Sequence, residues 1–372
     1  MRTDHVGDVD VDTDFEPLEL NTLSKDGDTL EPIPLVFIEG WAAGTSAKIF
    51  SGLDGLLNEQ KAPDDQPRRM LVIKCGAYSS LWDRAHEIYA ALKGGTCDYG
   101  EEHSITHAHA RYGRTHENGL YENWSEDYPL HFVGHSFGGA TIYFLQHLLT
   151  SGQLLGSPAM MRSIITISSP LRGTPLATSI GQLDGPTAGQ KRFSIGWMMA
   201  VGVHLARTAN VIAQDVYDFG ADQWSNTDTE TDTSSRGVTN FLQSFFPSKG
   251  QAFSADCAGY DLLVDSMERY NQKTSLCDRT FYRSYTATTC LHIPNGIDVD
   301  TEPPPLPGVW HVRTFDNTTH FELVDYLWKV RTLSKTRQFW NELGIWLRRV
   351  DQEATSIRQE TVKGNTIAVA EA

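Results

Sequence analysis

The sequence predicts an α/β fold in which a mainly parallel β-sheet is covered by helices on both faces. Short segments rich in branched and aromatic residues, typical of buried strands, alternate along the chain with longer helical segments. One such strand runs directly into a serine turn flanked by glycines and then into an apolar helix. With 372 residues, 40% of them hydrophobic, the chain can bury one large core or two smaller ones.

The expected elements follow in chain order. Strands are expected at residues 33–38, 70–74, 130–133, 163–167, 281–286 and 309–314. Helices are expected at residues 82–92, 140–149, 194–213 and 335–350. The helix at 194–213 is apolar nearly all round, which fits either a core helix or a mobile cap over a lipid-binding cleft.

Composition separates the two ends of the chain from its middle. Residues 1–31 contain ten acidic and two basic residues and few apolar ones, which predicts a disordered acidic tail. Residues 32–350 form the expected folded domain, and residues 351–372 are expected to be a flexible C-terminal tail.

Charge and hydropathy restrict the partners. The net charge of −16 argues against nucleic acid and anionic lipid surfaces. No apolar run has the length of a transmembrane segment. The first residues lack the apolar core of a signal peptide, which predicts a cytoplasmic protein as written, or a secreted one where a leader is missing. The five cysteines form no C-x-x-C pair and are expected to be thiols, with one bridge at most.

The serine turn has the sequence pattern of a nucleophile elbow. Residues 134–138 read G-H-S-F-G between the expected strand and helix, which makes Ser136 the predicted nucleophile. An oxyanion hole needs two backbone donors. We assign them to the N–H of Phe137, after the nucleophile, and the N–H of Trp41, in the loop after the first strand.

A serine nucleophile also needs a histidine base and an orienting acid. In α/β hydrolases the order along the chain is serine, acid, histidine. Among the histidines after Ser136, His147 and His204 fall in expected helices and His311 in an expected strand. His320 follows the last expected strand, in a loop at the catalytic edge of the sheet, and is the predicted general base.

A second cluster of polar residues suggests a metal site. Asp83 precedes three histidines within seven residues, His103, His107 and His109. Spacing alone favours His103 and His107, which are four apart on a helix. A polar surface turn is the alternative.

The segments around Asp83 and the three histidines resemble a known family. Residues 79–84 (SSLWDR), 94–100 (GGTCDYG) and 107–115 (HAHARYGRT) resemble the zinc-containing thermoalkalophilic bacterial lipases, and later blocks at 216–219, 222–224 and 308–310 agree. The resemblance implies an α/β-hydrolase fold with an inserted zinc subdomain, at about 79–116 and 215–225, and a helical lid at about 183–214. It also implies hydrolysis of triacylglycerols and simpler esters.

The resemblance further implies a set of zinc ligands. Matched residue by residue, they fall on Asp83, His103, His109 and Asp222, so that His109 replaces His107. Two carboxylates and two imidazoles can close a tetrahedral site with no open position, which makes the zinc structural. The family's oxyanion donors fall on the same two residues as above.

The chain departs from the family at four places. Glu39 stands where the family has histidine before the Gly-Phe of its first loop, and Phe137 stands where the family's elbow has glutamine. The segment that carries the family's triad acid is shortened here, which leaves Asp298 as the nearest replacement and Asp300 behind it. The family's calcium site is matched only at Glu322, since Asp325 has a different offset.

Together these features predict a carboxylic ester hydrolase, a lipase or esterase that takes a lipid or ester substrate. Ser136, His320 and Asp298 are its expected triad. A catalytically impaired hydrolase fold that binds lipid or serves as a scaffold is the alternative, motivated by Glu39 and the shortened acid segment. An acyltransferase with the same triad would differ only in its acceptor.

Overall fold

The computed structural model describes residues 31–41, 52–107, 109–183, 189–190, 256–288, 304–324 and 333–370. Nearly all of the expected acidic tail and lid, the helix at 194–213 and the second part of the zinc insertion lie outside these residues. The described elements are β1 (Leu35–Ile38), α1 (Leu53–Asn58), β2 (Met70–Ile73), α2 (Leu81–Lys93), β3 (Gly95–Asp98), α3 (Glu101–His107), β4 (Tyr112–His116), β5 (Leu130–His135), α4 (Phe137–Thr150), η2 (Pro158–Met160), β6 (Met161–Ile167), α5 (Pro175–Ser179), β7 (Gln182–Leu183), β8 (Gly189–Gln190), α8 (Ala258–Asp261), α9 (Val264–Asn271), β9 (Phe281–Thr288), β10 (Trp310–Asp316) and α10 (Leu333–Ala370).

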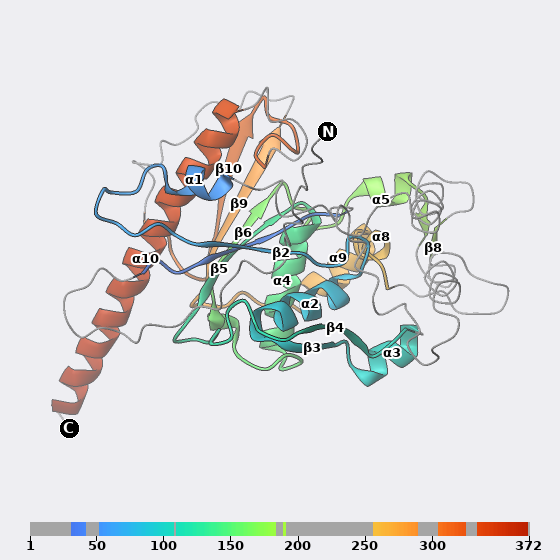
Figure 1. The fold of residues 1–372 in the computed structure, drawn as a ribbon, viewed down its shortest axis with the longest axis horizontal. Helices are drawn as coiled ribbons and strands as arrows, with labels where there is room; N and C mark the ends of the chain where they lie inside the picture. Colours follow the sequence, from blue (N-terminus) through green and yellow to red (C-terminus); the bar gives the residue numbers. More distant parts are fainter. Residues whose placement is uncertain are drawn as a thin grey trace, which may run out of the picture.

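A six-stranded sheet in the order β10-β9-β6-β5-β1-β2 forms the centre of the fold (Figure 1). Every neighbouring pair in it is parallel. The six strands correspond to the six expected from the sequence, so the predicted parallel sheet is confirmed. Because the strands run in one direction, their carboxyl ends and the loops that follow them meet at one edge.

Helices cover both faces of this sheet (Figure 1). On one face, α2 and α4 pack against the strands through aliphatic side chains such as Leu81, Ile88 and Leu145. On the other face, α1 and α10 contribute a second apolar cluster that includes Phe339 and Trp340. The predicted α/β layering is therefore confirmed.

A small antiparallel hairpin, β3 with β4, lies apart from the main sheet and carries α3 between its strands. Most of its strand residues are polar and are exposed or half-buried. The sequence therefore has no run of apolar residues that predicts these strands. It falls within the first part of the expected insertion, residues 79–116.

The last helix is longer than expected. The sequence predicted a helix at 335–350 and a flexible tail from residue 351, whereas α10 continues to Ala370 and projects beyond the sheet (Figure 1). The added residues mix strong helix formers, such as alanine, glutamate and glutamine, with weak ones, such as threonine and glycine. In the described part of the chain, no helix combines the length and the apolar character needed to cross a membrane.

Candidate active site and metal centre

Ser136 lies between β5 and α4, where the backbone reverses sharply. Its φ of 53° and ψ of −124° belong to a region that residues with a side chain rarely adopt. The Ser136 N–H donates a hydrogen bond to the carbonyl oxygen of Ile167 at 2.8 Å, which holds the turn against the end of β6. The strand, turn and helix expected around this serine are therefore present.

The glycines beside Ser136 are required by close packing. A Cβ at Gly134 would collide with the backbone of Gly138, and a Cβ at Gly138 would collide with the carbonyl oxygens of Ile38 and Glu39. Glycine at both positions lets β5, α4 and the end of β1 meet without side chains between them.

The segment after β1 packs directly against the serine. A Cβ built on Gly40 would lie 3.0 Å from the Cβ of Ser136. Trp41 follows and contacts Tyr78 edge-on, with 5.8 Å between ring centroids. Phe137, the first residue of α4, is fully buried. The two residues assigned as oxyanion donors thus belong to the segments on either side of Ser136.

A buried arginine fixes this segment to the helices. The Arg84 guanidinium, in α2, donates to the carbonyl oxygen of Glu39 at 2.6 Å, to that of Gly76 at 2.7 Å and to the Thr141 hydroxyl at 3.1 Å. These bonds join α2, α4 and the end of β1 in the interior.

His320 lies at the same edge of the sheet. Its carbonyl oxygen accepts a 3.0 Å hydrogen bond from Nε2 of His135, the neighbour of Ser136, and the two rings are 4.7 Å apart. Desolvation lowers the pKa of His320, which favours the neutral imidazole that a general base requires. Within the described residues, no hydrogen bond joins its ring to the Ser136 hydroxyl or to a carboxylate. The candidate acids Asp298 and Asp300 lie outside the described residues.

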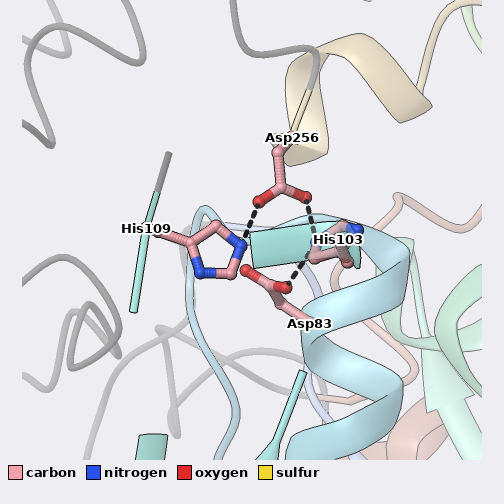
Figure 2. Close-up of side chains that lie close together, drawn as sticks. All are labelled: Asp83, His103, His109 and Asp256. Atoms are coloured by element: carbon pink, nitrogen blue, oxygen red, sulfur yellow. Dashed lines mark hydrogen bonds and ion pairs between the residues drawn. The ribbon is translucent and has the colours of Figure 1, made fainter. Parts of the chain in front are cut away.

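Four side chains form a compact cluster suited to a metal ion (Figure 2). His103 Nε2 lies 3.2 Å from Asp83 Oδ1 and 3.3 Å from Asp256 Oδ1, and His109 Nε2 lies 3.3 Å from Asp256 Oδ2. All four potential ligand atoms lie within 4.8 Å of one another. Two imidazoles and two carboxylates at this spacing form a candidate metal-binding group.

Local structure orients each of these side chains. Asp83 lies in the first turn of α2, which begins where the Ser80 hydroxyl accepts a bond from the Asp83 N–H. His109 donates from Nδ1 to the carbonyl oxygen of Ala110 at 2.7 Å, which turns Nε2 toward the cluster. Such a bond on the second ring nitrogen is common for metal-binding histidines.

The electrostatics of the cluster favour a cation. Burial, and then the neighbouring Asp256, raises the pKa of Asp83, because two buried carboxylates oppose each other's ionisation. Burial lowers the pKa of His103, but hydrogen bonds to Asp256 and Asp83 outweigh it and raise that pKa to about 9. The two carboxylates thus favour positive charge at this position, either a proton on His103 or a bound cation.

The cluster contains three of the four expected ligands and one residue that the sequence did not suggest. The sequence match named Asp222, which lies outside the described residues, and the structure brings Asp256 to the fourth position. His109 is in the cluster, as the resemblance implied. His107 is not, and its ring instead packs on that of His103 at 4.5 Å. No local signal marks Asp256, which precedes a short helix far from the histidines in sequence.

Comparison with known sequences gives consistent matches. Residues 61–301 match the model of a family described as lipase-like, C-terminal domain. A lipase of Staphylococcus hyicus is 33% identical over 228 residues, covering 56% of this chain and 32% of that protein. Lipase 1 of Staphylococcus aureus strain Mu50 is 28% identical over 294 residues, and the match covers 72% of this chain and 40% of that protein. The chain therefore spans about a third of the length of the first relative and two fifths of the second.

Solved structures agree on the fold. The crystal structure of Staphylococcus hyicus lipase has a TM-score of 0.64 at 22% identity and covers 90% of this chain and 99% of that one. EstA from Clostridium botulinum has a TM-score of 0.59 at 22% identity, with coverage of 90% and 92%. These similarities bear out the expected α/β-hydrolase fold.

Proposed function

Because the chain belongs to the family of lipase-like C-terminal domains, we propose that it hydrolyses carboxylic esters of lipids through a serine nucleophile. The observation that carries this proposal is the position of Ser136. It occupies a strained turn at the carboxyl edge of a parallel sheet, and the main chain of His320 is bonded to its neighbour His135. Two segments that are distant in the sequence thus meet at one edge, which supports Ser136 as the nucleophile and His320 as the base.

The proposed reaction proceeds through an acyl-enzyme. Ser136 Oγ attacks the ester carbonyl carbon while His320 takes the hydroxyl proton, and Asp298 orients the imidazole. The N–H groups of Trp41 and Phe137 hold the oxyanion. The bond to the alcohol then breaks, and His320 gives the proton to the departing oxygen. Water, deprotonated by His320, attacks the acyl carbon. The bond to Ser136 Oγ then breaks, His320 returns the proton to that oxygen, and the acid is released.

We assign zinc to the cluster of Asp83, His103, His109 and Asp256. With all four positions filled by protein, the ion has a structural role: it holds together segments from α2, α3 and the start of α8. The fit rests on the donor set, on the buried carboxylates and on the orientation of His109.

The nucleophile is tested with Ser136→Ala. We expect the purified variant to fold, but to lose turnover of p-nitrophenyl esters by ~10³-fold or more and to escape labelling by a fluorophosphonate probe. Ser151→Ala, at the far end of the same helix, is the matched control and should keep both. Wild-type turnover in Ser136→Ala would refute the assignment. A series of esters from acetate to palmitate then defines the acyl preference.

A lipid-binding protein without catalysis is the second candidate. It is favoured by Glu39, a buried carboxyl in the segment after β1 that packs against Ser136. Failure of the folded wild type to react with the fluorophosphonate probe, together with retained binding of lipid vesicles, would support this candidate over the hydrolase.

A further inference from the structure

Glu39 is a buried acid that the proposed mechanism does not use. It directly follows β1, and only 2% of its surface is exposed. Neither carboxylate oxygen has a hydrogen-bond partner in the described part of the chain. The nearby Arg84 guanidinium bonds the Glu39 carbonyl oxygen and two other acceptors, not the carboxylate. Buried polar atoms without partners are rare in folded proteins and call for an explanation.

The strand register places this side chain beside the proposed active site. Ile38 pairs with Gly134 in β5 and with Ile73 in β2. One residue further along, Glu39 therefore lies between His135 and Lys74 at the carboxyl edge of the sheet. The next residue after Glu39, Gly40, is the one that packs on Ser136.

Burial favours the neutral form of Glu39 near pH 7, despite the cations around it. Burial raises its pKa to about 8, although Arg84 and Lys74 act in the opposite direction. From the neighbouring strand, His135 offers no positive charge, because burial and the nearby His320 lower its pKa to about 3. The Glu39 carboxyl is thus a protonated acid beneath the loop that carries Trp41.

We propose that Glu39 is a positioning residue of this hydrolase, and that the site works only while its side chain is uncharged. The proposal rests on the proposed ester hydrolysis. An uncharged Glu39 lets the Gly40–Trp41 segment lie against Ser136 and present its N–H to the oxyanion. An ionised Glu39 would place a second negative charge beneath a site that must stabilise one, in an interior where charges are weakly screened. Ionisation is therefore expected to switch the enzyme off.

The proposal predicts a particular pH profile. For an ester whose leaving group does not ionise, wild-type kcat should fall above about pH 8, by roughly tenfold per pH unit where ionised Glu39 dominates. In Glu39→Gln, which keeps the shape but not the titration, this decline should disappear while activity at pH 7 stays within about threefold. Lys74→Met removes a cation that favours the ionised form, so the decline should move to higher pH. The double variant should behave like Glu39→Gln alone.

Two results would overturn the proposal: a decline at the wild-type pH in Glu39→Gln, or no upward movement in Lys74→Met. Should Glu39→Gln misfold, as judged by near-ultraviolet circular dichroism, the Lys74→Met profile decides. These outcomes are separable from failure of the proposed function, which would appear as a wild type with no Ser136-dependent activity at any pH.

Discussion

The His131 ring is expected to make the fold sensitive to acid. It lies in β5, fully buried, and its two nitrogens reach different parts of the chain. Nδ1 lies 2.7 Å from the Ser163 hydroxyl, in β6, and Nε2 lies 3.0 Å from Asp351 Oδ1, in α10. Asp351 also accepts a 2.7 Å bond from Arg68. A neutral ring satisfies both contacts: Nε2 donates to the Asp351 carboxylate, and Nδ1 accepts from the Ser163 hydroxyl.

The magnitude follows from the pKa. Burial lowers the pKa of His131 from 6.5 to about 4, since the nearby Asp351 offsets only part of the desolvation. Between pH 6.5 and about pH 4, His131 binds a proton in the unfolded chain but stays neutral in the folded chain. The free energy of unfolding therefore falls as the pH drops, by ~1.4 kcal/mol per pH unit for this residue and by about 3 kcal/mol in full. The stability is present above pH 6.5 and lost toward pH 4.

Urea unfolding at a series of pH values from neutral to acid measures this effect. His131→Gln is neutral throughout and should show a shallower dependence on pH than the wild type, by up to one proton. His147→Gln, in α4 and only partly buried, is the control and should change the slope much less. An unchanged slope in His131→Gln would refute the reasoning, whatever its effect on stability at neutral pH.

Three other predictions concern the site. Purified wild type should contain about one zinc per chain and lose thermal stability on chelation; Asp256→Ala should lose the metal and Asp222→Ala should retain it, as elemental analysis would show. Asp298→Ala is expected to lower kcat by up to ~10⁴-fold and Asp300→Ala by far less. Wild-type kcat in both variants would exclude both residues as the acid. Arg84→Met leaves three buried acceptors without donors, so denaturant unfolding should show a loss of about 3 kcal/mol.

The central sheet was predictable because its signals are local. Each strand is a short run of branched or aromatic residues, and the glycines around Ser136 report close packing directly. The hairpin of β3 and β4 was missed because its strand residues are mostly polar and exposed or half-buried, so they show no alternation of apolar and polar side chains. The end of α10 was missed because its mixture of strong and weak helix formers, which includes Gly364 and three threonines, gives no clear helical signal.

The fourth member of the candidate metal cluster, Asp256, could not be found in the same way. The chain has 47 acidic residues, and nothing in the sequence near Asp256 separates it from the others. Its position depends on tertiary contacts: Asp261, five residues later, accepts hydrogen bonds from the Leu81 N–H at 2.6 Å and from the Tyr270 hydroxyl at 2.8 Å. These bonds dock α8 at the start of α2, next to Asp83.

Two adjacent residues of α2 connect the metal cluster to the proposed active site. Asp83 points into the cluster, while Arg84 reaches the carbonyl oxygen of Glu39 and the Thr141 hydroxyl of α4. Because both side chains are fully buried on one turn of helix, a shift of that turn would move both sites together. An ion at the cluster would therefore hold in place the contacts that press the Gly40 segment against Ser136. A metal centre without an open position can thus matter to catalysis through the placement of α2, without touching the substrate.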